Sequence, residues 1–312
     1  MRIEYHRTLL ADRVRNQAFH EALRRVVVKG ETTVADIGAG TGFLGFMAAR
    51  LGAKMVDFYE RAEIVEVAAK LARHNKIRNV RFTPAHSTDI DPPARADVVI
   101  SETLGNYAFE ENIIETLNDA RERFLNPGGT IIPSAVEQVV CPVVSRQLHA
   151  DLAIWDHVGF DLDFTPAKTM GLNNIYVRWF QPTDLLDGGT AARVWDKVSF
   201  DKPAKTTRSG EQSWPIMKPT VITGLGLWWR AELIEGIHLA TGPLDPRTHW
   251  EQLYLPALAP IEAVAGDTLN VKLRSTTSYE DGTNVIWTLR LLDAKGREKA
   301  KQALDLNKGF IP

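Results

Sequence analysis

The chain has 312 residues, 44% of them apolar, and a formal net charge of −2. This length suits two domains of ordinary size, and the near-neutral charge argues against a nucleic-acid or anionic-membrane partner. The single cysteine, Cys141, excludes an internal disulfide, and no run approaches the ~18 apolar residues of a membrane helix. We therefore expect a cytoplasmic protein.

Helix and strand patterns alternate through the first 132 residues. Apolar positions from Leu9 to Val27 follow helical spacing, which predicts one helix over residues 8–28, ended by Gly30. Predicted strands follow at 33–37, 54–59, 79–83 and 97–101, with predicted helices at 43–51, 62–75 and 112–124. This alternation predicts a parallel sheet with helices on both faces.

After Pro133 the pattern changes to short β-rich runs separated by Pro, Gly and Asp. These runs predict an antiparallel β barrel or sandwich and lie at 136–144, 175–179, 221–229, 234–240, 268–273 and 284–292. Residues 151–192 form an apolar insertion, either a packed subdomain or an exposed arm for self-association. Residues 201–219 read as a long loop. The predicted domains are therefore 1–132 and 133–312.

The segment 34–42, Val-Ala-Asp-Ile-Gly-Ala-Gly-Thr-Gly, joins a predicted strand to a helix. In this arrangement backbone N–H groups face a ligand. The spacing of Gly38, Gly40 and Gly42 is not the dinucleotide pattern, and Asp36 would repel a pyrophosphate but suits the ammonium of a methionine tail. Glu60, which ends the second strand, can accept hydrogen bonds from two ribose hydroxyls. The segment thus favours S-adenosylmethionine over a nicotinamide cofactor or a turn without a ligand.

Residues 101–111 place two glutamates nine residues apart after the fourth predicted strand. Gly105 permits a turn between Glu102 and Glu111, so both carboxylates can reach one point. Converging carboxylates need a cationic partner, and a planar guanidinium fits. The alternative is a solvated turn and a charge at a helix N-terminus, which is how we interpret Glu110. His249, taken alone, is more typical of a structural histidine.

With these features combined, the chain resembles the protein arginine methyltransferase family over nearly its whole length. The resemblance rests on residues 6–15, the segment around Gly38, Glu60, the hairpin 101–111 and Thr248-His249-Trp250. It implies a class I, Rossmann-like S-adenosylmethionine-dependent methyltransferase domain followed by a β-barrel domain. It also implies a helical dimerisation arm within 151–192, a homodimer, and a domain hinge at Ile132-Pro133 that can hold a cis bond.

The resemblance also implies roles for individual residues. The residues that would bind S-adenosylmethionine are His6, Arg15, Asp36, Gly38, Gly40, Glu60 and Thr88, with Arg15 paired to the methionine carboxylate. The catalytic residues would be Glu102 and Glu111, which hold the guanidinium, and His249 beside Asp12, which takes up or relays the proton.

The sequence departs from the family pattern at three places. Only five residues precede His6, where the family carries a further helix with aromatic residues over the cofactor. In the hairpin, this chain has Thr103 and Asn106 where the family usually has Trp and Tyr. It has Thr88 where the family commonly has an acidic residue near the adenine. The predicted activity is methylation of a guanidino nitrogen in an arginine-containing protein or peptide. The alternatives are methylation of a small guanidine or amine, and a non-catalytic cofactor-binding partner of an active enzyme.

Overall fold

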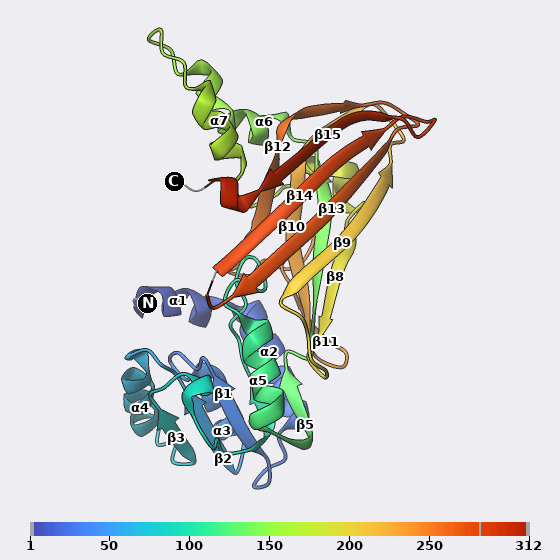
Figure 1. Cartoon of the computed structure of the whole chain (residues 1–312). Coiled ribbons are helices and arrows are strands. Elements are labelled where there is room, and N and C mark those ends of the chain that lie inside the picture. The colour runs from blue at the N-terminus through green and yellow to red at the C-terminus, as the bar shows by residue number, and fades with distance from the viewer. Residues whose placement is uncertain (1–2, 281, 310–312) are drawn as a thin grey trace.

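The computed structural model describes residues 3–280 and 282–309, which form two parts joined end to end (Figure 1). The first part is a five-stranded sheet in the order β3-β2-β1-β4-β5, in which every strand pair is parallel. Its elements are α1 (Ile3–Ala11), α2 (Arg13–Val26), β1 (Thr33–Ile37), α3 (Phe43–Leu51), β2 (Met55–Tyr59), α4 (Ile64–His74), β3 (Val80–Thr83), η1 (Ser87–Asp89), β4 (Ala96–Ile100), α5 (Ile113–Arg123) and β5 (Leu125–Ile132).

The parallel sheet and its alternating helices are as predicted, except that the fifth strand, β5, was not predicted. Because β2, β1 and β4 are neighbours, their carboxyl ends meet at one edge, which is where such sheets bind ligands. The segments that follow these three strands carry Glu60, Gly38 and Glu102. The sheet therefore gathers residues that are far apart in the sequence.

The single helix predicted over residues 8–28 is wrong. The structure has two helices, α1 and α2, which are separated at Asp12. The Asp12 backbone is extended, and its side chain accepts a hydrogen bond from Arg15 N at 2.9 Å. An aspartate satisfies the free N–H groups of a new helix better than it continues an old one, so the capping preference overrides the apolar spacing.

The second part consists of two antiparallel sheets. One has the order β7-β12-β10-β6-β8 with β11 paired to β10, and the other has the order β15-β14-β13-β9. The strands are β6 (Ala135–Val143), β7 (Tyr176–Arg178), β8 (Arg193–Ser199), β9 (Thr207–Pro215), β10 (Thr220–Ile234), β11 (Ile237–Ala240), β12 (Gln252–Ala263), β13 (Thr268–Ser278), β14 (Gly282–Leu292) and β15 (Glu298–Asp305). The described strands thus build a barrel-like domain from two separate ladders.

Two details of this part differ from the prediction. The supposed loop 201–219 contains β9, whose Thr207–Ser213 portion is almost entirely polar. Strands β8, β12 and β15 were not predicted, because β12 carries Pro256 and Pro260 and β15 is rich in charge. Propensity and alternation are weak signals in strands of this kind, where cross-strand pairing decides the conformation.

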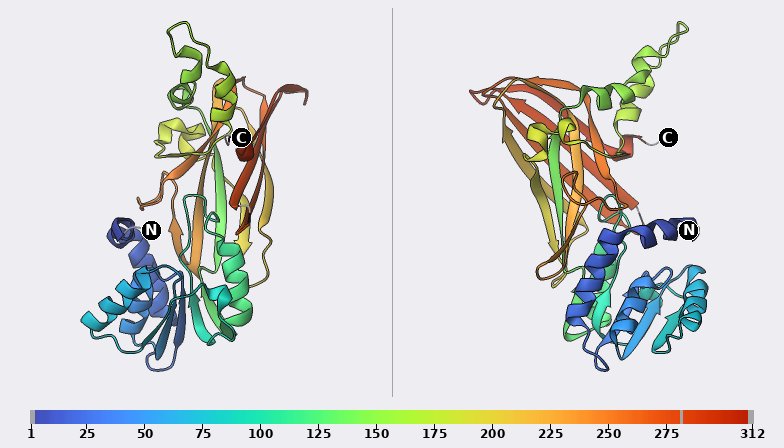
Figure 2. Two further views of the ribbon diagram at one scale, coloured as in Figure 1. Left: turned by 60° about the vertical axis from the view of Figure 1, so that its left-hand side comes forward. Right: turned by 180° about the vertical axis from the view of Figure 1, so that it is seen from behind.

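The insertion is helical, as expected for an arm. It comprises α6 (Arg146–Leu152), η2 (Ile154–His157) and α7 (Thr165–Leu172), followed by β7, η3 (Pro182–Asp184) and η4 (Leu186–Gly189). Figures 1 and 2 show α6 and α7 at the end of the second part that is remote from the parallel sheet. At its tip Phe160 is 92% exposed and Leu162 is 59% exposed, so the arm presents apolar surface to solvent.

The two parts meet where β5 ends at Ile132 and β6 begins at Ala135. The predicted cis bond is present between Ile132 and Pro133. No helix in the described ranges 3–280 and 282–309 has the length and apolar character to cross a membrane.

Candidate functional site

A cavity of about 660 Å³ opens at the carboxyl edge of the parallel sheet, and residues of both parts line it. This size is typical of sites for small molecules and cofactors. The predicted site residues that line it are His6, Arg15, Asp36, Gly38, Gly40, Glu60, Glu102, Glu111 and His249. Asp12 and Thr88 do not line it.

The glycine segment forms the floor of the cavity with a left-handed backbone at Gly38 and Gly40, where φ is 72° and 54°. A side chain at Gly38 would meet Thr103 Cγ2 at 2.8 Å, and one at Gly40 would meet the His6 ring at 3.0 Å. Glu60 fastens the turn, because its Oε2 accepts from Gly40 N at 2.9 Å and its Oε1 from Ala62 N at 2.8 Å. Both the backbone conformation and the available space therefore require glycine at these positions.

Asp36 lies at the end of β1 and is 2% exposed. Its Oδ2 accepts from Gly45 N at 2.8 Å. Burial raises the pKa of Asp36 to about 7, against the lowering effects of the Gly45 hydrogen bond and the Arg15 charge. A buried carboxyl of this kind favours a cationic partner, which would return its pKa toward the ordinary value.

Arg15 forms an ion pair with Glu102, and both side chains are 6% exposed. Arg15 Nε donates to Glu102 Oε2 at 2.7 Å, and Nη2 donates to the same oxygen. The predicted pairing of Arg15 with a methionine carboxylate stays a prediction. Of the carboxylates that line the cavity, Glu102 is the one Arg15 contacts, and burial of both charges is tolerable only when they are paired.

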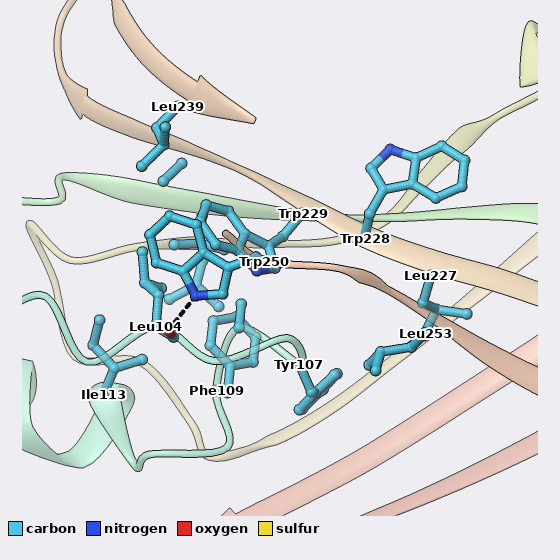
Figure 3. Packing of buried hydrophobic residues seen from close by; sticks show 14 of the residues in the cluster. Leu104, Tyr107, Phe109, Ile113, Leu227, Trp228, Trp229, Leu239, Trp250 and Leu253 are labelled. Atoms are coloured by element: carbon cyan, nitrogen blue, oxygen red, sulfur yellow. Dashed lines mark hydrogen bonds between the residues drawn. The ribbon is translucent and has the colours of Figure 1, made fainter. Parts of the chain in front are cut away.

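The hairpin that carries Glu102 and Glu111 is held by hydrogen bonds from the second part. Trp229 Nε1 donates to Gly105 O, and Trp250 Nε1 donates to Leu104 O, each at 2.8 Å. Figure 3 shows the Trp250 indole directed at Leu104 within the apolar cluster that joins the two parts. These two tryptophans fix the backbone between the glutamates.

Polar contacts complete the support of the hairpin. Asn106 Oδ1 accepts from Glu251 N at 2.9 Å. Glu110 folds back over Gly105, and its Oε1 accepts from Asn106 N at 2.9 Å. The assignment of Glu110 to a helix N-terminal charge is therefore wrong, since this side chain braces the turn of the hairpin.

Glu111 faces the cavity and has no ion-pair partner within residues 3–280 and 282–309. Although the side chain keeps contact with solvent, its pKa is raised, first by desolvation and then by the charges of Glu102, Glu110 and Glu60. Like charges around a carboxylate disfavour its ionised form unless a cation is present. The hairpin therefore presents an unneutralised negative site beside the glycine floor.

His249 lies beside Asp12, the arrangement that the resemblance implied. Asp12 Oδ2 is 2.7 Å from His249 Nδ1 and accepts from His249 N at 2.8 Å. The imidazole packs on the Trp250 ring with centroids 3.8 Å apart. Because Nδ1 is held by a carboxylate, Nε2 is the free ring nitrogen, and it is buried without a partner among the described residues.

Of two residues that were predicted to bind the cofactor, His6 lines the cavity and Thr88 does not. His6 packs against Gly40, and its Nε2 is likewise buried without a partner in the described chain. Thr88 is exposed, and its Oγ1 lies 2.7 Å from His86 Nδ1. The placement of Thr88 at the cavity is wrong, because η1 turns its side chain toward His86, and His86 and Ser87 line the cavity instead.

The lining residues that the sequence analysis missed include Asn112 and Tyr279. Asn112 caps α5 in a left-handed conformation with φ 59°, and its Oδ1 is buried without a partner among the described residues. Tyr279 reaches the cavity from the end of β13, about 160 residues further along the chain. A left-handed asparagine after Glu111 is a weak signal at best, and nothing in the sequence connects Tyr279 to this site.

Comparisons with known proteins cover most of the chain. A family model described as a methyltransferase domain matches residues 29–169, and one described as an arginine methyltransferase oligomerization subdomain matches residues 137–287. A probable histone-arginine methyltransferase 1.4 from Arabidopsis thaliana is 30% identical over 86% of this chain and 54% of its own length. An arginine N(omega)-methyltransferase from Streptomyces achromogenes is 29% identical over 86% of this chain and 75% of its own.

The solved structures agree on the fold. One chain from a Trypanosoma brucei PRMT1 enzyme-prozyme heterotetrameric complex with AdoHcy matches 97% of this chain and 98% of its own, at a TM-score of 0.85 and 21% identity. The chain spans about half the length of the plant relatives that it matches.

Proposed function

We propose that this chain belongs to the protein arginine methyltransferase family and transfers a methyl group from S-adenosylmethionine to a guanidino nitrogen of arginine in a protein or peptide. The observation that carries the proposal is a single cavity shared by the glycine floor with Asp36 and Glu60 and by the pair Glu102 and Glu111. The first group suits the donor, and the second suits a cationic acceptor.

The residues of the cavity fit S-adenosylmethionine. Asp36 is a buried carboxyl that a ligand ammonium would stabilise, and Glu60 stands at the end of the neighbouring strand β2 for a ribose. His6 Nε2 is a buried polar atom that needs a partner. When bound, S-adenosylmethionine would supply an activated methyl group, so the protein has mainly to bind, orient and exclude water.

The hairpin supplies the acceptor chemistry. Glu102 and Glu111 would hold the guanidinium, draw its charge toward the nitrogens they contact and leave the remaining nitrogen free to react. Arg15 pairs with Glu102 and fixes its orientation. This division of roles makes Glu111 the carboxylate whose charge is left for the acceptor.

The pair Asp12 and His249 would take up the proton that the methylated nitrogen loses. Asp12 accepts from Nδ1–H and thereby leaves the lone pair on Nε2 of His249. Because proton loss becomes easy once the methyl group has moved, a modest base suffices. The retained residues Glu102, Glu111 and His249 support an enzyme over a non-catalytic partner.

Glu111→Gln tests this proposal. We expect turnover on an arginine-containing peptide to fall at least about 100-fold, because a neutral amide cannot balance the guanidinium charge. The Kd for S-adenosylhomocysteine, measured by calorimetry, should stay within about threefold of wild type. Glu122→Gln is the matched control, since Glu122 lies on α5, the helix that follows Glu111, and its side chain is 72% exposed. Equal loss of cofactor binding and turnover in Glu111→Gln would show that Glu111 is not an acceptor residue.

We further propose that the protein works as a homodimer in the cytoplasm. The exposed apolar tip of the arm and the match to an oligomerization subdomain support self-association. The free and buried Cys141 is compatible with a reducing compartment. The division at residue 132 and the hinge role of Ile132-Pro133 remain predictions.

A further inference from the structure

Tyr279 belongs to the second part of the molecule but lines the cavity of the first. It follows directly after β13, at the end of the β13–β14 pair that approaches the first part (Figure 1). The residue is 49% exposed, so about half of its surface is uncovered.

Two hydrogen bonds connect this residue to α5. Tyr279 Oη lies 2.7 Å from Thr116 Oγ1, and Tyr279 N donates to Glu115 Oε2 at 3.2 Å. The ring also meets His86 edge to face, with centroids 5.4 Å apart and planes at 86°. Thr116 and His86 line the cavity as well. The phenol is therefore held in one position at the cavity wall by both of these side chains.

The order of strands shows which end of the cavity this is. The carboxyl ends of β1, β2 and β3 lie side by side and carry, in that order, Asp36, Glu60 and the segment with His86. The ligand has the same linear order of methionine tail, ribose and adenine. The segment with His86, against which the Tyr279 ring packs, thus lies where the base would be.

The acceptor end has a different aromatic residue. Tyr5 is the cavity-lining tyrosine whose pKa is raised, after the effect of its burial, by Glu111, Glu102 and Glu110. The charges that act on Tyr279 are instead those of Glu115, Arg61 and Asp119. The two half-exposed tyrosines therefore serve opposite ends of the cavity.

We propose that Tyr279 is a further cofactor-binding residue, which covers the adenine base of S-adenosylmethionine with its ring and so couples the second domain to cofactor binding. This inference rests on the proposed function. Aromatic rings are effective covers for a purine, because base and ring stack through their faces or edges.

Calorimetric titration with two probes tests the proposal without turnover. S-adenosylhomocysteine and 5′-methylthioadenosine share the nucleoside, but only the first has the amino-acid tail. We expect Tyr279→Ala to raise the Kd of both probes by the same factor, about 10-fold. Tyr279→Phe keeps the ring and loses only the contact to Thr116, so its Kd values should stay within about threefold of wild type. Met217→Ala, which removes an 80% exposed side chain from the second part, should change neither.

Four other results would overturn the inference. Wild-type affinity in Tyr279→Ala would show that the ring does not cover the base, and equal losses in Tyr279→Phe and Tyr279→Ala would assign the effect to the hydroxyl. A loss confined to S-adenosylhomocysteine would place Tyr279 at the amino-acid end. Failure of the wild-type protein to bind either probe would refute the proposed function together with this inference, whereas the first three results leave that function intact.

Discussion

Asp12 connects helix α2 to His249. Replacing Asp12 can therefore distinguish its role as the cap of α2 from its role as the hydrogen-bond acceptor for His249. Asp12→Ala removes the helix cap at Arg15 N, which contributes about 1 kcal/mol. It also leaves the backbone N–H and Nδ1 of His249 without their acceptor, at a cost of about 1–2 kcal/mol each for buried groups. The free energy of unfolding should therefore fall by about 4 kcal/mol.

Asp12→Ser is the discriminating companion. A serine hydroxyl can cap Arg15 N but is too short to serve His249 as well, so we expect a loss of about 3 kcal/mol. Urea denaturation followed by circular dichroism measures both losses. If Asp12→Ala costs only about 1 kcal/mol, or if Asp12→Ser restores full stability, Asp12 is a helix cap and the reasoning about His249 is refuted.

The pH dependence of the same variants gives a second check. Burial raises the pKa of Asp12, but the hydrogen bonds from His249 and from Arg15 N outweigh it, so the net pKa lies below the ordinary 3.8. A lowered carboxyl pKa stabilises the fold above the ordinary value and ceases to do so as pH falls through the folded-state pKa. The stability difference between wild type and Asp12→Ser should thus be full at neutral pH and shrink below pH 3.8.

Two further predictions concern the cofactor and the arm. Burial raises the pKa of Asp36 to about 7, so the unliganded protein loses stability as pH rises from the ordinary carboxyl range toward that value. Binding of the S-adenosylhomocysteine ammonium should therefore release protons from Asp36 at pH 7. Calorimetry in buffers of different ionisation enthalpy measures this release, and Asp36→Asn should abolish it. Heats that do not depend on the buffer would contradict this role for Asp36. Replacing both Ile154 and Phe160 by serine should lower self-association, measured by sedimentation velocity, and leave cofactor affinity unchanged. A wild-type protein that is monomeric at micromolar concentration would contradict the proposed dimer.

The polar site residues were visible in the sequence where a strand ends and the chain must turn. Asp36, Gly38 and Glu60 follow directly from strand ends in a parallel sheet, and Glu102 and Glu111 follow from a turn of fixed length. The direction of the Thr88 side chain could not be predicted from the local sequence, because in a short 3₁₀ turn a shift of one residue turns a side chain away from the cavity. The helix boundary at Asp12 was also missed, because the apolar spacing continues across it.

The sequence by itself determined the alternating strands and helices, the glycine floor and the spacing of the two glutamates. These features depend on neighbouring residues, whose backbone preferences and periodicity are local. Only the tertiary structure decided that Arg15 pairs with Glu102, that two tryptophans hold the hairpin, and that Tyr279 enters the cavity. Such contacts join residues far apart in the chain, up to 237 positions for Asp12 and His249. They arise from tertiary packing within and between the two parts, which no local pattern encodes.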